Sequence, residues 1–269
     1  MNTGPTIRTM TLDDWDAFQQ IDKEIFPDDL LLRDWFEKRL TRDGFFAMDL
    51  DGELVGMLIV TPFGDDGGHL GRIGVSRVHQ GKGLGSKLIE KAIEWFNEHE
   101  QIRFVHLYTQ HDNHVAQGLY RKYGFEVTGT TWHYYVPHDT LSPRSLYSCN
   151  EIEQYEIDTV GERYNDSFPA AQIRRFLESD DYKIFTLKDE TGGLVGACRF
   201  TPSFPGCFPF ELDRVEGFDD FMSGLLPHSL PEFDYTRVTF SDNPELAKEC
   251  QSRGYALHHR LFKMTLKLV

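Results

Sequence analysis

The residues from Gln80 to Ser86 have the composition of an anion-binding turn. They follow an apolar, strand-like run at 70–75 and precede a periodic stretch at 86–99 that predicts a helix. Backbone N–H groups in such a turn point at a bound anion, and the helix N-terminus adds partial positive charge. Glycine also lets a diphosphate approach the backbone closely. We therefore predict that a phosphorylated cofactor binds at Gln80, Gly81, Lys82, Gly83, Leu84, Gly85 and Ser86.

The spacing of the glycines separates this turn from two other phosphate loops. A Walker A loop ends in Gly-Lys-Ser/Thr, whereas Lys82 lies between two glycines. A dinucleotide loop needs Gly-x-Gly-x-x-Gly, whereas the spacing here is Gly-x-Gly-x-Gly. From the glycines alone, a tight strand-to-helix connection without a ligand remains an alternative. In that case Lys82 is a solvated lysine rather than a phosphate contact.

A second motif follows the apolar run at 104–108. Together, the two motifs resemble those of the GNAT acetyltransferases, and the resemblance extends over about residues 5–137. The family carries Gln/Arg-x-x-Gly-x-Gly/Ala at the cofactor diphosphate, followed by Asn-x-x-Ala-x-x-x-Tyr-x-x-x-Gly-Phe. Both occur here in that order, at Gln80, Gly83, Gly85, Asn113, Ala116, Tyr120, Gly124 and Phe125.

This resemblance implies a co-substrate, acetyl-CoA, and the groups that hold it. The cofactor would lie in a wedge between two splayed parallel strands at 72–75 and 104–108. Backbone groups of Ile73 and Val75 would bind the pantetheine arm. Asn113 would orient that arm or a water molecule, although it could equally cap the helix that follows it.

Acetyl transfer to an amine needs an acid for the departing thiolate and a base for the amine. The resemblance implies that Tyr120 is the acid, since a phenol with a pKa of about 10 can protonate a thiolate. The alternative is a packing role. Many relatives place a glutamate base on the strand before the glycine turn, but residues 69–75 include no carboxylate. His69 is the nearest titratable candidate, and a water chain or an already neutral amine are the alternatives.

The composition is that of a soluble globular protein of 269 residues, 26% of them charged. A net charge of −15, spread over both halves, argues against nucleic acid as a partner. It favours a cationic substrate such as an amine, or simply keeps the protein soluble. We see no apolar run of membrane-spanning length and no signal peptide. Four cysteines without a Cys-x-x-Cys pair predict neither a metal site nor a disulfide framework, and they favour the reducing cytoplasm.

The second half of the sequence repeats the first, which has the predicted order β-α-α-β-β-β-α-β-α-β-β. We therefore predict an α/β fold with a mixed sheet in two tandem GNAT-like domains, at 1–138 and 151–269 with a linker at 139–150. The repeated patterns are Leu-Val-Gly, four residues and Thr-Pro at 54–62 and 194–202; Phe-Pro at 26–27 and 168–169; and Asn, ten residues and Gly-aromatic at 113–125 and 243–255.

The second repeat lacks the glycine turn, because about ten residues are missing between 202 and 243. Cys250 takes the position of Tyr120. Without the turn a diphosphate would lose several charge-assisted hydrogen bonds of about 1.5–3 kcal/mol each. We therefore expect a structural or substrate-shaping domain that binds CoA poorly or not at all. His258 and His259 are consecutive on the predicted last strand, so they should face opposite sides and be structural.

The leading expectation is an acetyl-CoA-dependent N-acetyltransferase that acts in its first domain by direct attack. The acceptor would be a small-molecule amine or a protein amino group, bound, as the resemblance implies, near 26–40 and 132–135. A non-catalytic acyl-CoA sensor and a transferase for a longer acyl group are the alternatives. Neither the acceptor nor the oligomeric state is specified by the sequence.

Overall fold

The computed structural model describes residues 4–268, which divide into two compact units. The first unit takes in residues up to Thr128 and the segment from Met264 onward, and the second unit is Gly129–Lys263. The sequence instead predicted a first domain ending at 138 and a second starting at 151. The boundaries differ because two long strands, β6 (Glu126–Pro137) and β12 (Ala256–Lys267), each contribute residues to both units.

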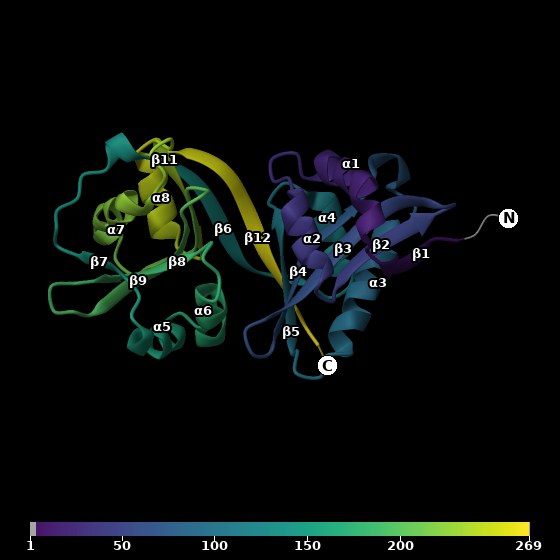
Figure 1. The fold of residues 1–269 in the computed structure, drawn as a ribbon, viewed down its shortest axis with the longest axis horizontal. Coiled ribbons are helices and arrows are strands. Elements are labelled where there is room, and N and C mark those ends of the chain that lie inside the picture. Colours follow the sequence, from purple (N-terminus) through teal and green to yellow (C-terminus); the bar gives the residue numbers. More distant parts are fainter. Residues whose placement is uncertain (1–3, 269) are drawn as a thin grey trace. The chain divides into compact units, whose positions relative to one another are not determined.

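Up to α4 the elements of the first unit follow the predicted order, as Figure 1 shows. They are β1 (Thr6–Thr9), α1 (Trp15–Ile25), α2 (Arg33–Leu40), β2 (Phe45–Leu50), β3 (Glu53–Phe63), β4 (Gly67–Val75), α3 (Leu84–Asn97), β5 (Phe104–Gln110), α4 (His114–Lys122) and the start of β6. The strands pair in the order β1-β2-β3-β4-β5, followed by the end of β12.

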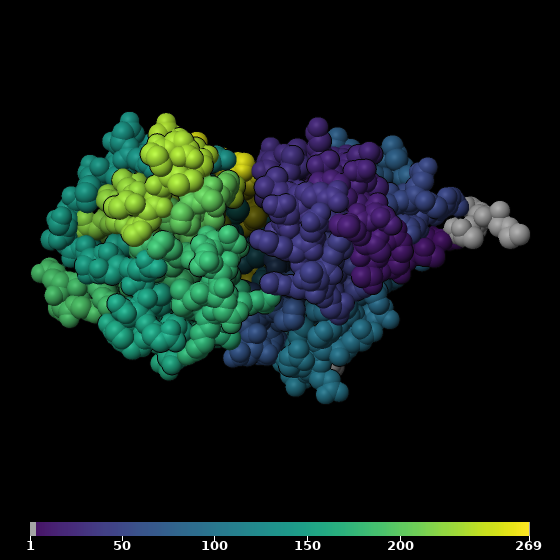
Figure 2. All heavy atoms as spheres, viewed as in Figure 1, coloured from purple at the N-terminus to yellow at the C-terminus, as the bar shows by residue number. Residues whose placement is uncertain are grey.

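Helices cover both faces of this sheet. On one face Phe18 of α1 and Phe36 of α2 pack against Phe45 and Met57, all of them buried. In the space-filling view, α1 and α2, coloured purple to blue, cover the strands of this unit (Figure 2). On the other face α3 lies so close that a Cβ on Gly68 would come within 2.5 Å of the Phe96 ring. The strands are thus fixed from both sides.

Strands β4 and β5 are paired only at their beginnings. The parallel ladder joins Gly67 to Phe104, Gly68 to Val105 and His69 to His106. Beyond His69, no further pairing between these two strands is found in the described part of the chain. The two strands therefore separate after this point, which is the gap that the sequence led us to expect.

The second unit repeats this architecture, as predicted. Its elements are β7 (Ser148–Glu151), α5 (Ile157–Arg163), α6 (Ala170–Leu177), β8 (Lys183–Lys188), β9 (Leu194–Thr201), β10 (Gly206–Leu212), α7 (Phe218–Leu225), β11 (Tyr235–Ser241), α8 (Pro244–Ser252) and most of β12. The strand order is β6-β11-β10-β9-β8-β7. None of the helices within residues 4–268 has the length and apolar character needed to cross a membrane.

Local details of the two repeats also correspond. A capping box joins Thr11 and Asp14 before α1, and another joins Glu153 and Glu156 before α5. The predicted linker is not a free segment, because the N–H groups of residues 145, 146 and 147 all donate to the Asp220 carboxylate. Its last residues already belong to β7.

The first unit receives its last strand from the far end of the sequence. The N–H of Leu268 donates to the Arg103 carbonyl at 2.9 Å, and Thr265 shares a hydrogen bond with Thr128 at 2.7 Å. The predicted order for the first half ended in two strands, whereas that half supplies only β6. Local pattern cannot reveal this, because strand pairing is a non-local property.

Candidate functional site

The glycine turn has the backbone conformation that only glycine adopts easily. Gly81 and Gly83 have φ angles of +74° and +80°, and Gly83 is the N-cap of α3. A Cβ built on either would meet no atom within 4 Å, so the turn faces open space. Gly85 differs, since its Cβ would lie 3.1 Å from Leu119 of α4. The first two glycines thus shape the turn, and the third allows α3 and α4 to approach.

Three contacts hold the turn in place. Gln80 Nε2 donates to the Val75 carbonyl at 2.9 Å, which ties the turn to the end of β4. Ser76 Oγ and His79 Nδ1 share a hydrogen bond of 2.9 Å within the short connection. The Arg77 N–H donates to the Glu24 carboxylate at 2.6 Å, which links this connection to α1.

The start of α3 is suited to an anion. Its first residues are Leu84, Gly85, Ser86 and Lys87, so no carboxylate there neutralises the partial positive charge of the helix N-terminus or repels an anion. The first N–H groups of a helix have no acceptor within it. Leu84 is buried and anchors the helix, whereas Gln80, Gly81, Lys82 and Gly83 are exposed. The turn can therefore present backbone donors and the Lys82 charge to a ligand.

Tyr120 is buried in α4, with 7% of its surface exposed. Its ring centroid lies 6.0 Å from that of Phe125. Burial raises the pKa of Tyr120 to about 12, so the phenol keeps its proton at neutral pH. Tyr123, the other tyrosine of this segment, is half-buried and donates its hydroxyl to Glu90 of α3 at 2.7 Å.

Asn113 caps α4. Its side-chain oxygen accepts from the Ala116 N–H at 3.1 Å, which is the capping role left open by the sequence. Sequence reasoning missed Gln117, which is buried and donates from Nε2 to the carbonyls of Gln110 and His111 at 2.9 and 3.0 Å. Gln117 fixes the end of β5 against α4, and nothing in the motif distinguished it from a surface glutamine.

His69 belongs to an aromatic cluster at the point where β4 and β5 separate. Its ring stacks on His106 at 4.8 Å and lies 6.1 Å from Tyr108, while Phe63 contacts His106 at 4.7 Å. Burial lowers the pKa of His69 to about 4, so its imidazole is neutral at pH 7 and can accept a proton. Sequence reasoning missed His106 and Tyr108, because two aromatic residues on a strand usually belong to the core.

An ion-pair network positions the segment between α1 and α2. Arg72 of β4 bonds to the buried Asp22 of α1, and its Nη2 lies 2.9 Å from Asp29 Oδ2. The guanidinium also lies 4.4 Å from the Phe26 ring centroid, a cation–π contact. Asp22 accepts the Leu31 N–H at 2.9 Å as well. These contacts set the conformation of the segment that the resemblance assigned to the acceptor.

The structure does not bring the two predicted catalytic residues onto one face of the sheet. His69 pairs with Thr61 of β3. Thr61 and Ile59 lie on the same face of the sheet, and α1 and α2 pack on that face. Tyr120 lies on α4, which packs beside α3 on the opposite face. A substrate that passes through the gap between β4 and β5 could meet both groups. Ile73 and Val75 line the β4 side of that gap.

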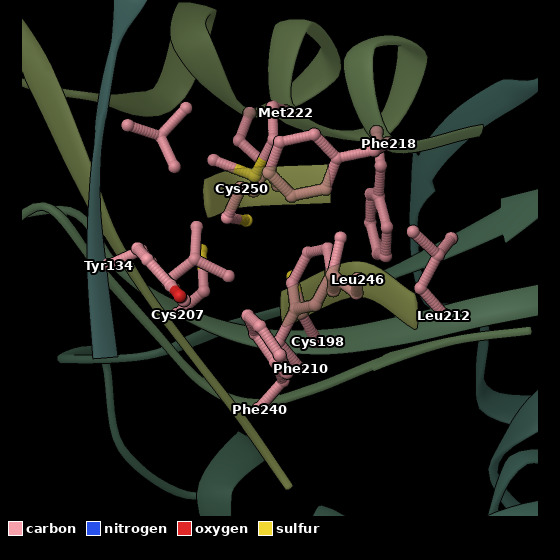
Figure 3. Close-up of a cluster of buried hydrophobic side chains, with 14 of the residues drawn as sticks. Tyr134, Cys198, Cys207, Phe210, Leu212, Phe218, Met222, Phe240, Leu246 and Cys250 are labelled. Carbon is pink, nitrogen blue, oxygen red and sulfur yellow. The ribbon is translucent and has the colours of Figure 1, made fainter. Parts of the chain in front are cut away.

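The second unit has no counterpart of this site. Asn243 Nδ2 donates to the Leu212 carbonyl at 2.9 Å, which joins the end of β10 to the start of α8. Figure 3 shows the buried cluster on one face of this unit, where Leu212, Phe210 and Leu246 pack together. Its α7 follows β10 after a short turn whose one glycine, Gly217, has φ −80°, so the positive-φ glycines of the first unit have no equivalent there. The gap between β10 and β11 is therefore bridged and packed.

Two further sequence expectations concern histidines and metals. The rings of His258 and His259 lie 3.8 Å apart, so they do not point to opposite sides as strict alternation predicts. Side chains on a strand can lean along it, which brings neighbouring rings together. Among the described residues, no group of three or more His, Cys, Asp or Glu side chains is arranged to hold a metal ion.

Comparison with known proteins agrees with this geometry. Residues 7–125 match the model of the acetyltransferase (GNAT) family. The first repeat is a GNAT domain. It is also similar to a Bacillus subtilis (strain 168) protein provisionally named [ribosomal protein bS18]-alanine N-acetyltransferase, with 28% identity over 138 residues. That match covers 51% of this chain and 90% of the relative.

Solved structures show that the GNAT-like fold extends over both repeats. A Pyrococcus horikoshii protein described as an acetyltransferase aligns with a TM-score of 0.74 and 15% identity, covering 100% of this chain and 91% of its own. A tandem GNAT protein from the clavulanic acid biosynthesis pathway aligns with a TM-score of 0.66 and 14% identity, covering 98% of each chain. At these identities the likeness concerns the fold alone.

Proposed function

We propose that the first unit is an acetyl-CoA-dependent N-acetyltransferase that acts on the primary amine of a small molecule or a protein. The observation that carries this proposal is the open glycine turn, with Gly81 and Gly83 at positive φ, at the end of a strand that separates from its parallel neighbour. Such a turn leaves room for a diphosphate at the backbone, and the start of α3 supplies donors without an opposing carboxylate.

The residues around the gap have separate binding roles in this proposal. The turn from Gln80 to Ser86 holds the diphosphate of CoA, with Lys82 as an additional charge. Ile73 and Val75 offer backbone groups to the pantetheine arm. The Val75 carbonyl already accepts from Gln80, so this bond keeps the turn and the strand end in register. Acetyl-CoA, when bound, supplies an activated acyl thioester.

The chemistry then requires two proton transfers. The amine nitrogen attacks the thioester carbonyl carbon, the C–S bond breaks, and Tyr120 gives its proton to the departing sulfur. A phenol whose pKa is about 12 is fully protonated at neutral pH, so it is ready for this step. His69, neutral at pH 7, accepts the proton that the nitrogen loses, directly or through water. Solvent then restores both groups.

The acceptor side of the sheet limits the substrate to an amine that reaches the aromatic cluster of His69, His106 and Tyr108. The similarity to a protein named as an alanine N-acetyltransferase supports a peptide amino group as one candidate. The negative charge of the chain, −15, attracts cationic amines of either class. We also propose a cytoplasmic setting, supported by the four free thiols.

Release of free thiol from acetyl-CoA, measured with a panel of amines, tests the proposal. The panel should include a peptide with an N-terminal alanine and several small polyamines. We expect amine-dependent thiol release, and one acetyl-CoA bound per chain, because the second unit lacks the turn. Binding without transfer to any amine would support the acyl-CoA sensor instead. Faster release from longer acyl-CoA thioesters would indicate a different acyl group.

A further inference from the structure

One face of the second unit's sheet carries two half-buried arginines and a half-buried histidine. Alternate residues of a strand share a face, so Arg199 on β9 lies on the same side as Ala197, which packs with α5 and α6. Ladder partners on neighbouring strands share a face as well. Thr201 shares that side of β9 and pairs with Gly206, which pairs in turn with Arg237 on β11. Arg237 pairs with Tyr135 of β6, two residues from His133. We name this surface, with Arg199, Arg237 and His133, the arginine face.

Arg199 is held between two aromatic rings. Its guanidinium carbon lies 4.6 Å from the ring centroid of Phe176 and 4.6 Å from that of Tyr182. Its Nε is buried and has no hydrogen-bond partner among the described residues. Burial lowers the pKa of Arg199, as expected for a charge removed from water. In the first repeat the same position is Ile59, a core residue, so the fold does not need an arginine there.

Arg237 and His133 extend the same pattern. The Arg237 guanidinium lies 4.4 Å from the Phe204 ring centroid, and no carboxylate among the described residues forms an ion pair with it. His133 Nδ1 is buried without a partner in the same part of the chain. The pKa of His133 falls to about 3, mainly through burial and then through the charges of Arg237, His259 and His258. The arginine face is thus electropositive within a chain that carries 43 acidic residues.

An acidic side chain on this side, that of Glu211, does not neutralise the arginines. Glu211 pairs with Ala197 on β9 and so lies on the arginine face. Burial raises the pKa of Glu211 to about 7, and its side chain hydrogen-bonds to Ser167. The Glu211 carboxyl therefore already has a hydrogen-bond partner in Ser167, and it is only partly ionised at neutral pH. Removing part of a cation from water without a counter-ion costs free energy, which an anionic ligand paired with it would offset.

We propose that the arginine face of the second unit binds a small organic polyanion, through carboxylate or phosphate groups that pair with Arg199 and Arg237. A guanidinium that stacks on aromatic rings keeps its N–H fork in one plane, the geometry that carboxylate and phosphate oxygens accept. Two separate arginines on one face match a ligand with two or more anionic groups. The second repeat has thus lost its cofactor gap but gained an anion site that the first repeat does not have.

Titration calorimetry of the full-length chain tests this proposal with two probes, citrate for carboxylates and inorganic phosphate for phosphates. Each titration is run with and without saturating CoA, because phosphate could also enter the glycine turn of the first unit. We expect saturable binding that persists with CoA present. The preferred probe identifies the anionic group. Because the readout is binding to the second unit, the result is independent of any acetyl transfer.

Two variants remove the guanidinium groups: Arg199→Ile, which takes the residue found at Ile59 of the first repeat, and Arg237→His. Each should weaken binding of the preferred probe at least tenfold, as expected for loss of a charge-assisted pair, while CoA binding stays unchanged. The exposed Arg144→Ala is the matched control and should bind as the native chain does. Arg199→Lys, which keeps the charge without the planar fork, guards against a folding defect and should bind at intermediate strength. No binding of either probe to the native chain, or equal binding by Arg199→Ile and Arg144→Ala, overturns the proposal.

Discussion

Gln80 Nε2 donates to the carbonyl oxygen of Val75 at 2.9 Å, at the end of β4. The corresponding carbonyl in the second unit is that of Leu212, because Val75 pairs with Gly56 and Leu212 with Gly196 of the repeated tripeptide. Leu212 accepts from Asn243, which lies beyond β11. The carbonyl of Val75 therefore supports a turn beside an open gap in the first repeat. The equivalent carbonyl of Leu212 helps to close the gap in the second repeat.

Removing the hydrogen bond from Gln80 to Val75 should make the glycine turn less rigid but leave the turn in place. Gln80→Met keeps the side-chain length but cannot donate to Val75. A net hydrogen bond is worth about 1 kcal/mol, so we expect KM for acetyl-CoA to rise about fivefold while kcat changes less than twofold. Steady-state kinetics at saturating amine measures both. A fall in kcat with an unchanged KM would instead mean that Gln80 acts during the chemical step.

A methyl group on Gly83 should block the diphosphate. Gly83→Ala places a side chain at φ +80° in the space proposed for the ligand, so we expect acetyl-CoA affinity to fall at least tenfold. Gly52→Ala is the matched control, because Gly52 has φ +88°, an equally open Cβ position and a place in the β2–β3 turn. Both variants should lose about 1 kcal/mol of stability. Equal affinities for acetyl-CoA would exclude the turn as the binding site.

Local patterns predicted the elements of the first unit because each is signalled by its own residues. The periodic stretch at 86–99 became α3, Leu84–Asn97. The glycine turn was readable because positive φ restricts residue choice to few types. The repeat was found from short matches, and the strand ladders of the two units confirm it.

Pairing between distant segments could not be predicted from the sequence. Nothing local shows that the strand ending at Lys267 completes the first unit, or that Asn243 bridges to Leu212. His106 and Tyr108 were missed for the same reason, since only the parallel ladder places His106 beside His69. The sequence offered both capping and ligand binding as roles for Asn113 and could not decide between them, because both use the same side-chain groups.

Loss of the Tyr120 hydroxyl should affect chemistry more than binding. Tyr120→Phe keeps the packing on Phe125 but removes the proton donor, so kcat should fall about 10²-fold or more with little change in acetyl-CoA affinity. Tyr123→Phe is the control, since it removes only the hydroxyl bound to Glu90 at the surface. Single-turnover thiol release and equilibrium binding separate the two effects. Native kcat and an unchanged pH profile in Tyr120→Phe would reject its role as the acid.

The two asparagine caps should differ in their value to stability. Asn113→Ala removes a cap from α4, worth about 1 kcal/mol. Asn243→Ala removes the equivalent cap from α8 and also the bond to Leu212, so it should cost about 1 kcal/mol more. Urea unfolding of both variants measures the difference. If the two costs are equal, the bridge across the second gap contributes nothing and packing alone closes it.

The half-buried His69 should make the folded state sensitive to acid. Its pKa of about 4 lies below the ordinary value of 6.5, so between these pH values the unfolded chain binds a proton that the folded chain does not. Stability is therefore complete above pH 6.5 and is lost as pH falls toward 4, by up to about 3 kcal/mol from this residue. His69→Gln should flatten this part of the curve of unfolding free energy against pH. The pKa of His133 falls to about 3, so the unfolding free energy of His69→Gln should still depend on pH. His133→Gln should remove that remaining part of the pH dependence. An identical pH dependence in the native chain and His69→Gln would show that the imidazole is solvated, and hence free to act as a base of ordinary pKa.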